Sequence, residues 1–268
     1  MRTERDSTDG IIAGAETIDL QGEKSFGVLL LHGFGDTPQT FKLLAKDLHS
    51  AGFGARAPLL PGHGRSVQTF IDSRRGQWLD FARQELVIFR RRYTMVGLVG
   101  LSMGGAIAAL LAAENPDLPA LVLIAPYFGM RLNYRAASAS YWLWGPIAGT
   151  VKSESPGSIR DPIERQKNLG HGVYTGRLLY ELWRLAHDAR LALPLIRTPT
   201  LLIQSKEDPR VSASMAERAY ESLGSTDKRL VWTKGAGHII TVDYGRERVF
   251  KEVRDWLRAH MRINVATA

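Results

Sequence analysis

Residues 95–114 read MVGLVGLSMGGAIAALLAAE and place Ser102 between two apolar segments. The first, Met95–Leu101, favours a buried strand, and the second, Met103–Glu114, favours a helix rich in Ala and Leu. The turn between them holds Gly100-Leu101-Ser102-Met103-Gly104, a G-x-S-x-G pattern. A strand-to-helix turn this tight strains the serine backbone and projects its Oγ above a sheet, while the glycines avoid Cβ clashes with neighbouring backbone. We therefore predict that Ser102 is a nucleophile at the end of a strand.

Apolar runs alternate with amphipathic stretches along most of the chain, which is typical of a mostly parallel sheet covered by helices. The other expected strands are Phe26–Leu31, Leu118–Ala125, Pro199–Ser205 and Arg229–Thr233. The other expected helices begin near Thr37-Pro38 or span Gln77–Arg91, Ser212–Leu223 and Arg246–His260. Thr37 is expected to cap its helix and Pro38 to take the first helical position, where no N–H is needed. The predicted fold class is therefore α/β.

Residues 126–197 interrupt this alternation, because they show no clear strand and carry many aromatic residues. These are Tyr127, Phe128, Tyr134, Tyr141, Trp142, Trp144, Tyr174, Tyr180 and Trp183. We predict a helical cap insertion here, over the carboxyl edge of a sheet formed by residues 1–125 and 198–268. The aromatic residues either form a small core of the insertion or line an apolar pocket, and both readings can hold for different residues.

The composition is that of an ordinary soluble protein, with 44% hydrophobic and 23% charged residues in a chain of 268. The absence of cysteine excludes disulfides, a cysteine nucleophile and a Cys-ligated zinc site. The formal charge of +8 comes from scattered basic residues without a nucleic-acid-binding signature. Residues 1–10 lack the apolar run of a signal peptide, and runs such as Leu118–Ala125 are too short to span a bilayer. We expect a cytoplasmic protein without nucleic-acid partners or stable membrane insertion, and its oligomeric state is not indicated.

A second glycine-rich turn, Leu31-His32-Gly33-Phe34-Gly35, follows the early strand. In folds with a strand–serine–helix turn, one donor to a developing oxyanion is the backbone N–H of the residue after the serine, here Met103. The other donor comes from the loop after the early strand, where Phe34 is the candidate. His32 is expected to brace this loop through hydrogen bonds rather than to act as a base.

A base and an acid should follow the nucleophile along the chain, with the acid first. His238 lies in Gly235-Ala-Gly-His238, after the last predicted strand, where a base could reach Ser102. Asp208 and Glu207 both follow the preceding strand. We prefer Asp208, because its short side chain followed by proline suits a fixed loop carboxylate. The remaining histidines lie on predicted helices, in the insertion, or in the turn Pro61-Gly-His63-Gly64, which we expect to be structural.

Four motifs together resemble those of the α/β-hydrolase superfamily and, within it, bacterial carboxylesterases and monoacylglycerol lipases. They are Leu29-Leu30-Leu31-His32-Gly33-Phe34, Pro61-Gly62-His63-Gly64, Gly100-Leu101-Ser102-Met103-Gly104-Gly105 and Gly237-His238-Ile239-Ile240-Thr241-Val242-Asp243. The resemblance implies an α/β-hydrolase fold and a small cap over an apolar acyl pocket. It also implies a triad of Ser102, Asp208 and His238, with oxyanion donors at Phe34 and Met103. After the expected strand Pro199–Ser205, many members of the superfamily carry a glycine that this chain lacks. Glu207 therefore stays open as an alternative to Asp208 as the acid.

These features predict a serine hydrolase that cleaves carboxylic esters of short or medium acyl chains, with monoacylglycerols among the candidates. The expected partner is a small-molecule ester, and no metal or organic cofactor is needed. An acyltransferase, a thioesterase, a carbon–carbon bond hydrolase or a lipase acting at lipid surfaces are enzymatic alternatives. A dehalogenase is disfavoured, because that chemistry needs aspartate at the position of Ser102. A ligand receptor on the same fold is the non-enzymatic alternative, and an ordered Ser, Asp and His argue against it.

Overall fold

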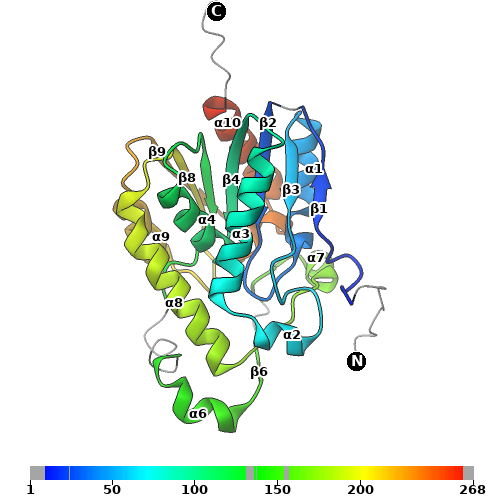
Figure 1. The fold of residues 1–268 in the computed structure, drawn as a ribbon, viewed down its shortest axis with the longest axis vertical. Coiled ribbons are helices and arrows are strands. Elements are labelled where there is room, and N and C mark those ends of the chain that lie inside the picture. Colours follow the sequence, from blue (N-terminus) through cyan, green and yellow to red (C-terminus); the bar gives the residue numbers. More distant parts are fainter. Residues whose placement is uncertain (1–9, 24, 131–135, 137, 154–156, 262–268) are drawn as a thin grey trace, which may run out of the picture.

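The protein folds around a seven-stranded sheet with the strand order β1-β3-β2-β4-β5-β8-β9 (Figure 1). The computed structural model describes residues 10–23, 25–130, 136, 138–153 and 157–261. The strands are β1 (Ile18–Leu20), β2 (Phe26–Leu31), β3 (Gly54–Ala57), β4 (Met95–Leu101), β5 (Leu121–Ile124), β8 (Thr200–Ser205) and β9 (Lys228–Thr233). Only the β1–β3 pair is antiparallel within this described sheet, so the predicted α/β class and mostly parallel sheet are confirmed.

Helices cover both faces of the sheet. They are α1 (Lys42–Ser50), α2 (Val67–Asp72), α3 (Arg75–Arg90), α4 (Met103–Glu114), α9 (Ala213–Ser222) and α10 (Arg246–His260), besides those of the insertion. One core contains side chains of α3, α4 and α9 against Leu29 and Leu31 of β2. The other core contains side chains of α1 and α10 against Val28 and Leu30 of the same strand. Because successive side chains of a strand point to opposite faces and both faces are buried, this strand is apolar throughout instead of alternating.

Four predicted elements have the expected bounds, namely β2, β4, α4 and α10. The prediction that Thr37 caps the N-terminus of a helix is wrong in one respect. Pro38 does open a helix, the 3-10 turn η1 (Pro38–Phe41) that continues into α1, but the Thr37 side chain makes no capping hydrogen bond. Its hydroxyl is buried without a partner among the described residues. The strand expected over Leu118–Ala125 is shorter, and β1, β3 and α2 were not predicted.

The described part of the segment between β5 and β8 contains helices and a small two-stranded sheet. Its elements among the described residues are α6 (Tyr141–Ala148), β6 (Val151–Lys152), α7 (Pro162–Lys167), β7 (Val173–Tyr174), α8 (Gly176–Ala192) and the 3-10 turn η2 (Leu193–Leu195). The expectation of no strand here is wrong, because β6 and β7 pair antiparallel. The inner face of α8, which includes Leu178 and Leu185, is buried in the core that also contains α4.

The aromatic residues of this segment have different surroundings. Tyr180 packs against Tyr141 at 5.0 Å and Trp183 at 5.7 Å between ring centroids, and all three side chains are partly exposed. Trp142 is 66% exposed, and Tyr134 lies outside the described residues.

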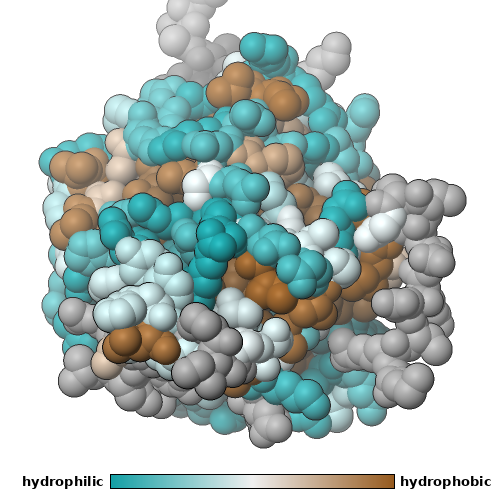
Figure 2. All heavy atoms as spheres, turned by 60° about the horizontal axis from the view of Figure 1, so that its bottom comes forward, coloured by the Kyte–Doolittle hydropathy of each residue, from teal (hydrophilic) through white to brown (hydrophobic). Residues whose placement is uncertain are grey.

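The face at the lower end of Figure 1 shows apolar patches divided by polar residues (Figure 2). Among the described helices, none combines the length and the apolar character needed to cross a bilayer.

Candidate active site

Ser102 lies in the turn between β4 and α4 with a strained backbone, at φ 54° and ψ −116°. The glycines around it have no room for a side chain. A Cβ at Gly100 would lie 2.3 Å from the carbonyl oxygen of Gly104, and a Cβ at Gly104 would lie 1.9 Å from that of Leu31. The turn therefore packs directly against β2, and the strained conformation is held by backbone on both sides.

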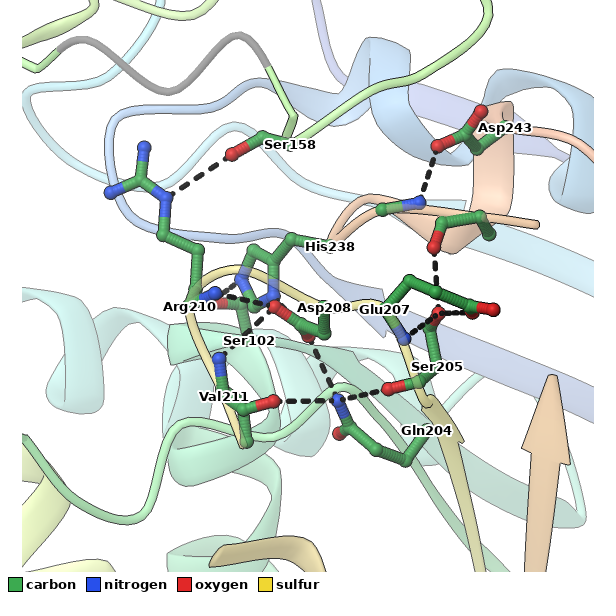
Figure 3. A network of polar contacts seen from close by, with 12 residues as sticks. Ser102, Ser158, Gln204, Ser205, Glu207, Asp208, Arg210, Val211, His238 and Asp243 are labelled. Atoms are coloured by element: carbon green, nitrogen blue, oxygen red, sulfur yellow. Dashed lines mark hydrogen bonds and ion pairs between the residues drawn. The ribbon is translucent and has the colours of Figure 1, made fainter. Parts of the chain in front are cut away.

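A hydrogen-bonded chain joins Ser102 to two residues from other strand ends (Figure 3). Its hydroxyl lies 2.8 Å from Nε2 of His238, and Nδ1 of His238 lies 2.7 Å from Oδ2 of Asp208. All three residues are buried. With the Nδ1 proton donated to the carboxylate, Nε2 is free to accept the proton of the serine hydroxyl.

The Asp208 carboxylate is held by further donors. The amide of Gln204 donates to Oδ2 at 2.9 Å, and the backbone N–H groups of Arg210 and Val211 donate to Oδ1 at 2.7 and 3.0 Å. Burial raises the pKa of this carboxyl, but the facing His238 and the hydrogen bonds outweigh it and hold the pKa below its ordinary value. The carboxylate is therefore ionised at neutral pH and fixed toward the imidazole.

Glu207 faces another way. Its carboxylate accepts hydrogen bonds from the hydroxyl of Ser205 and the backbone N–H of Gly235. The geometry thus brings Asp208, and not Glu207, against His238. Gln204 was not singled out from the sequence, although an amide directly after the apolar run Leu201-Leu202-Ile203 was a usable signal.

The loop that carries His238 is tied to the insertion. The carbonyl oxygen of Ser158 accepts the backbone N–H groups of His238 and Ile239, each at 2.9 Å. A Cβ at Gly237 would lie 2.1 Å from the carbonyl oxygen of Gly157, so the two backbones are in direct contact. The position of the imidazole therefore depends on the insertion as well as on the sheet.

The loop after β2 lies against the serine. A Cβ at Gly33 would be 3.4 Å from the Cβ of Ser102. The backbone N–H groups of Phe34 and Met103 donate to no acceptor among the described residues. Both are thus available to a bound anion, as expected of a site that stabilises an oxyanion.

His32 braces this loop, as predicted. Its Nδ1 lies 3.0 Å from the carbonyl oxygen of Gly33, and its Nε2 accepts the N–H of Leu60 at 3.1 Å. Burial lowers the pKa of His32 to about 4, so the ring is neutral at pH 7. His63 is also structural: Nδ1 lies 3.0 Å from the carbonyl oxygen of Pro61. Across the described part of the chain, no group of His, Asp and Glu side chains has the arrangement of a metal site.

The sequence matches the family described as "Serine aminopeptidase, S33" over residues 23–244. The chain belongs to this family. It is an enzyme, a serine hydrolase of the carboxylesterase and lipase type.

Known relatives agree with this assignment. A thermostable monoacylglycerol lipase of Bacillus sp. (strain H-257) is 26% identical over 251 residues, which cover 93% of this chain and 97% of the relative. A carboxylesterase of Bacillus subtilis (strain 168) is 25% identical over 240 residues, which cover 88% of this chain and 93% of the relative. A solved structure from work on the metagenome-derived lipolytic enzymes LipS and LipT has a TM-score of 0.85 and 26% identity, covering 93% of this chain and 100% of that chain. The predicted resemblance to α/β-hydrolases is confirmed.

Proposed function

We propose that the enzyme hydrolyses carboxylic esters through an acyl-enzyme intermediate, with Ser102, His238 and Asp208 as its catalytic triad. The observation that carries this proposal is the 2.8 Å separation between the Ser102 hydroxyl and Nε2 of His238, on a strained strand-to-helix turn. A serine hydroxyl is a weak nucleophile until an adjacent base takes its proton. Here the base is present and is oriented by a fixed carboxylate.

The reaction takes two acyl transfers. Ser102 Oγ attacks the ester carbonyl carbon while His238 takes the hydroxyl proton, and the resulting oxyanion accepts hydrogen bonds from the N–H groups of Phe34 and Met103. The carbon–oxygen bond to the alcohol then breaks, and His238 gives its proton to the leaving oxygen. Water, deprotonated by His238, attacks the acyl-serine, and the carboxylic acid leaves as the proton returns to Ser102. Asp208 stabilises the imidazolium in both halves.

We further propose that residues 126–197 act as a cap over the site and form an apolar pocket for a short or medium acyl chain, with monoacylglycerols among the substrates. Two observations support the cap. The backbone of Ser158 is bonded to the His238 loop, and the N–H of His171 donates to the carbonyl oxygen of Gly35 at 2.8 Å. The names of the relatives, a monoacylglycerol lipase and a carboxylesterase, support the substrate class.

Hydrolysis of p-nitrophenyl esters from acetate to palmitate tests the proposal. We expect activity on the shorter chains, a loss of at least roughly 10⁴-fold in kcat for Ser102→Ala, and no covalent labelling of that variant by a fluorophosphonate. Asp208→Asn should lose roughly 10⁴-fold in kcat, whereas the matched variant Glu207→Gln should stay within about twofold of the wild type.

Three results would overturn the proposal. Labelling that persists in Ser102→Ala would remove the nucleophile, and a greater loss in Glu207→Gln than in Asp208→Asn would move the acid. A folded wild type that is labelled but hydrolyses none of the esters would exclude simple ester hydrolysis. Thioesters and acyl acceptors other than water would then be the substrates to examine.

A further inference from the structure

Asp36 is a buried carboxylate that receives no hydrogen bond from the part of the chain that the structure describes. It is 9% exposed, and no described residue donates to it or pairs with it, although Asp208 and Asp243 each accept several hydrogen bonds. Burial raises the pKa of Asp36 to about 6, against the opposing influence of His238 and Arg210. Buried polar groups in native proteins are normally satisfied, so an unpartnered carboxylate calls for an explanation.

The position of Asp36 supplies one. A Cβ added at Gly33 would lie 2.9 Å from Oδ2 of Asp36 and 3.4 Å from the Cβ of Ser102, so both residues flank the same glycine. On its other side, a Cβ added at Gly170 of the insertion would lie 3.0 Å from Oδ1. The carboxylate is therefore located between the loop after β2 and the insertion, beside the nucleophile.

The chemistry of an ester substrate indicates which part of it Asp36 meets. An ionised carboxylate only accepts hydrogen bonds, and an aliphatic acyl chain carries no donor. In the ester that the proposed function requires, a donor to Asp36 therefore belongs to the alcohol moiety. Arg210 already supplies a positive charge to the same carboxylate, which favours a neutral donor over a second cation.

We propose that Asp36 is a specificity-determining residue that accepts a hydrogen bond from a hydroxyl group on the alcohol moiety of the substrate. The enzyme then prefers esters of polyols, such as glycerol, over esters of simple alcohols with the same acyl chain. This inference rests on the proposed ester hydrolysis. It accounts for a desolvated carboxylate near the nucleophile that has no partner among the described residues.

A matched pair of substrates tests the inference. 1-Butyrylglycerol and propyl butyrate share the acyl chain and the number of alcohol carbons, so the ratio of their kcat/KM values isolates the hydroxyl groups. We expect a ratio well above one for the wild type and a fall of roughly 10- to 100-fold in Asp36→Ala, the range for a hydrogen bond to a charged group. Asp36→Asn keeps an acceptor without the charge, so its ratio should fall less.

Asp80→Asn is the matched control, because Asp80 is an exposed carboxylate on α3 that pairs with Arg83; its ratio should equal that of the wild type. An unchanged ratio in Asp36→Ala would overturn the inference. Equal losses on both esters would also overturn it and give Asp36 a structural role. If 2-aminoethyl butyrate lost more than 1-butyrylglycerol in Asp36→Ala, the ligand would be an ammonium group and the hydroxyl assignment would be wrong.

Binding measured without turnover separates this inference from the proposed function. In the Ser102→Ala background, calorimetry should give tighter binding of 1-butyrylglycerol than of propyl butyrate, and Asp36→Ala should remove most of that difference. A wild type that hydrolyses neither ester would refute the proposed function. Equal affinities for the two esters would refute the role of Asp36. Thermal unfolding of each variant checks that it is folded.

Discussion

Asp243 accepts the backbone N–H of Gly237 at 2.7 Å, one residue before His238. The same carboxylate accepts the N–H groups of Arg160 and Asp161 from the insertion, at 2.8 and 2.9 Å. Its side chain is fully buried. One carboxylate therefore joins the loop that carries His238 to the segment between β5 and β8. We expect its role to be the positioning of His238.

We expect Asp243→Ala to lower the free energy of unfolding by about 3 kcal/mol or more, because several buried N–H groups lose a charged acceptor. The kcat for p-nitrophenyl butyrate should fall in the same variant through displacement of His238. Denaturant unfolding and steady-state kinetics measure the two effects. Asp255→Ala removes an exposed carboxylate of α10 that pairs with Lys251 and should change stability by no more than about 0.5 kcal/mol. Equal stabilities for the two variants would contradict the positioning role.

Close backbone packing around the serine turn gives a second prediction. Gly104→Ala would place a Cβ 1.9 Å from the carbonyl oxygen of Leu31, so β2 and α4 would have to separate. We expect this variant to be strongly destabilised and inactive, as judged by thermal unfolding and fluorophosphonate labelling. Gly76→Ala is the control, because a Cβ there meets nothing within 4 Å on helix α3. It should be stabilised by about 0.5–1 kcal/mol, and a Gly104→Ala protein of normal stability would show that the turn can relax.

The parts of the fold that the sequence predicts well are those set by neighbouring residues. The strand, turn and helix around Ser102 follow from adjacent residues and have the predicted bounds. The strand β3 was missed because it contains Arg56 and has no apolar run. That residue is accommodated through ion pairs with Asp19 and Glu85, which are far away in sequence, so no local pattern reports the strand.

The same limit applies to the site. Ser102, His238 and Asp208 could be proposed from motifs and chain order, and the structure brings them into one hydrogen-bonded chain. Asp36 and Asp243 could not, because what distinguishes them is the number of donors around each carboxylate. Asp243 has backbone N–H donors, and Asp36 has none among the described residues. The segments that surround each carboxylate are brought together only by folding.

Three histidines in one aromatic cluster make stability depend on pH. His63 contacts the rings of His32 and Phe70, and Phe70 stacks on His171 at 4.7 Å between centroids. Burial lowers the pKa of all three histidines, to about 4 for His32. Since the unfolded chain binds protons near the ordinary histidine pKa of about 6.5, their stabilising contribution is complete above that pH. It is lost as the pH falls from 6.5 through about 4.

His171→Phe tests this contribution at one site. Phenylalanine keeps the stacking on Phe70, which has an interplanar angle of 15°, and it removes an Nε2 atom that is buried without a partner in the described structure. The variant and the wild type should therefore differ by less than about 1 kcal/mol in free energy of unfolding at pH 8. As the pH falls below 6.5, the variant should become progressively more stable than the wild type, because it no longer loses the contribution of His171.

At each pH, the free energy of unfolding of His171→Phe is compared with that of the wild type. This is necessary because Asp36 changes the stability of both proteins in the same pH range with the opposite sign. Its pKa is raised from 3.8 to about 6, so stability is gained as the pH falls through that window. The contribution of Asp36 to stability is the same in both proteins, so it cancels in the difference. Urea unfolding at pH 8, 6 and 5 provides the measurement. If the two proteins instead lost stability in parallel as the pH falls, His171 would take up its proton equally in the folded and unfolded chains. The burial of His171 in the cluster would then not lower the stability at acid pH.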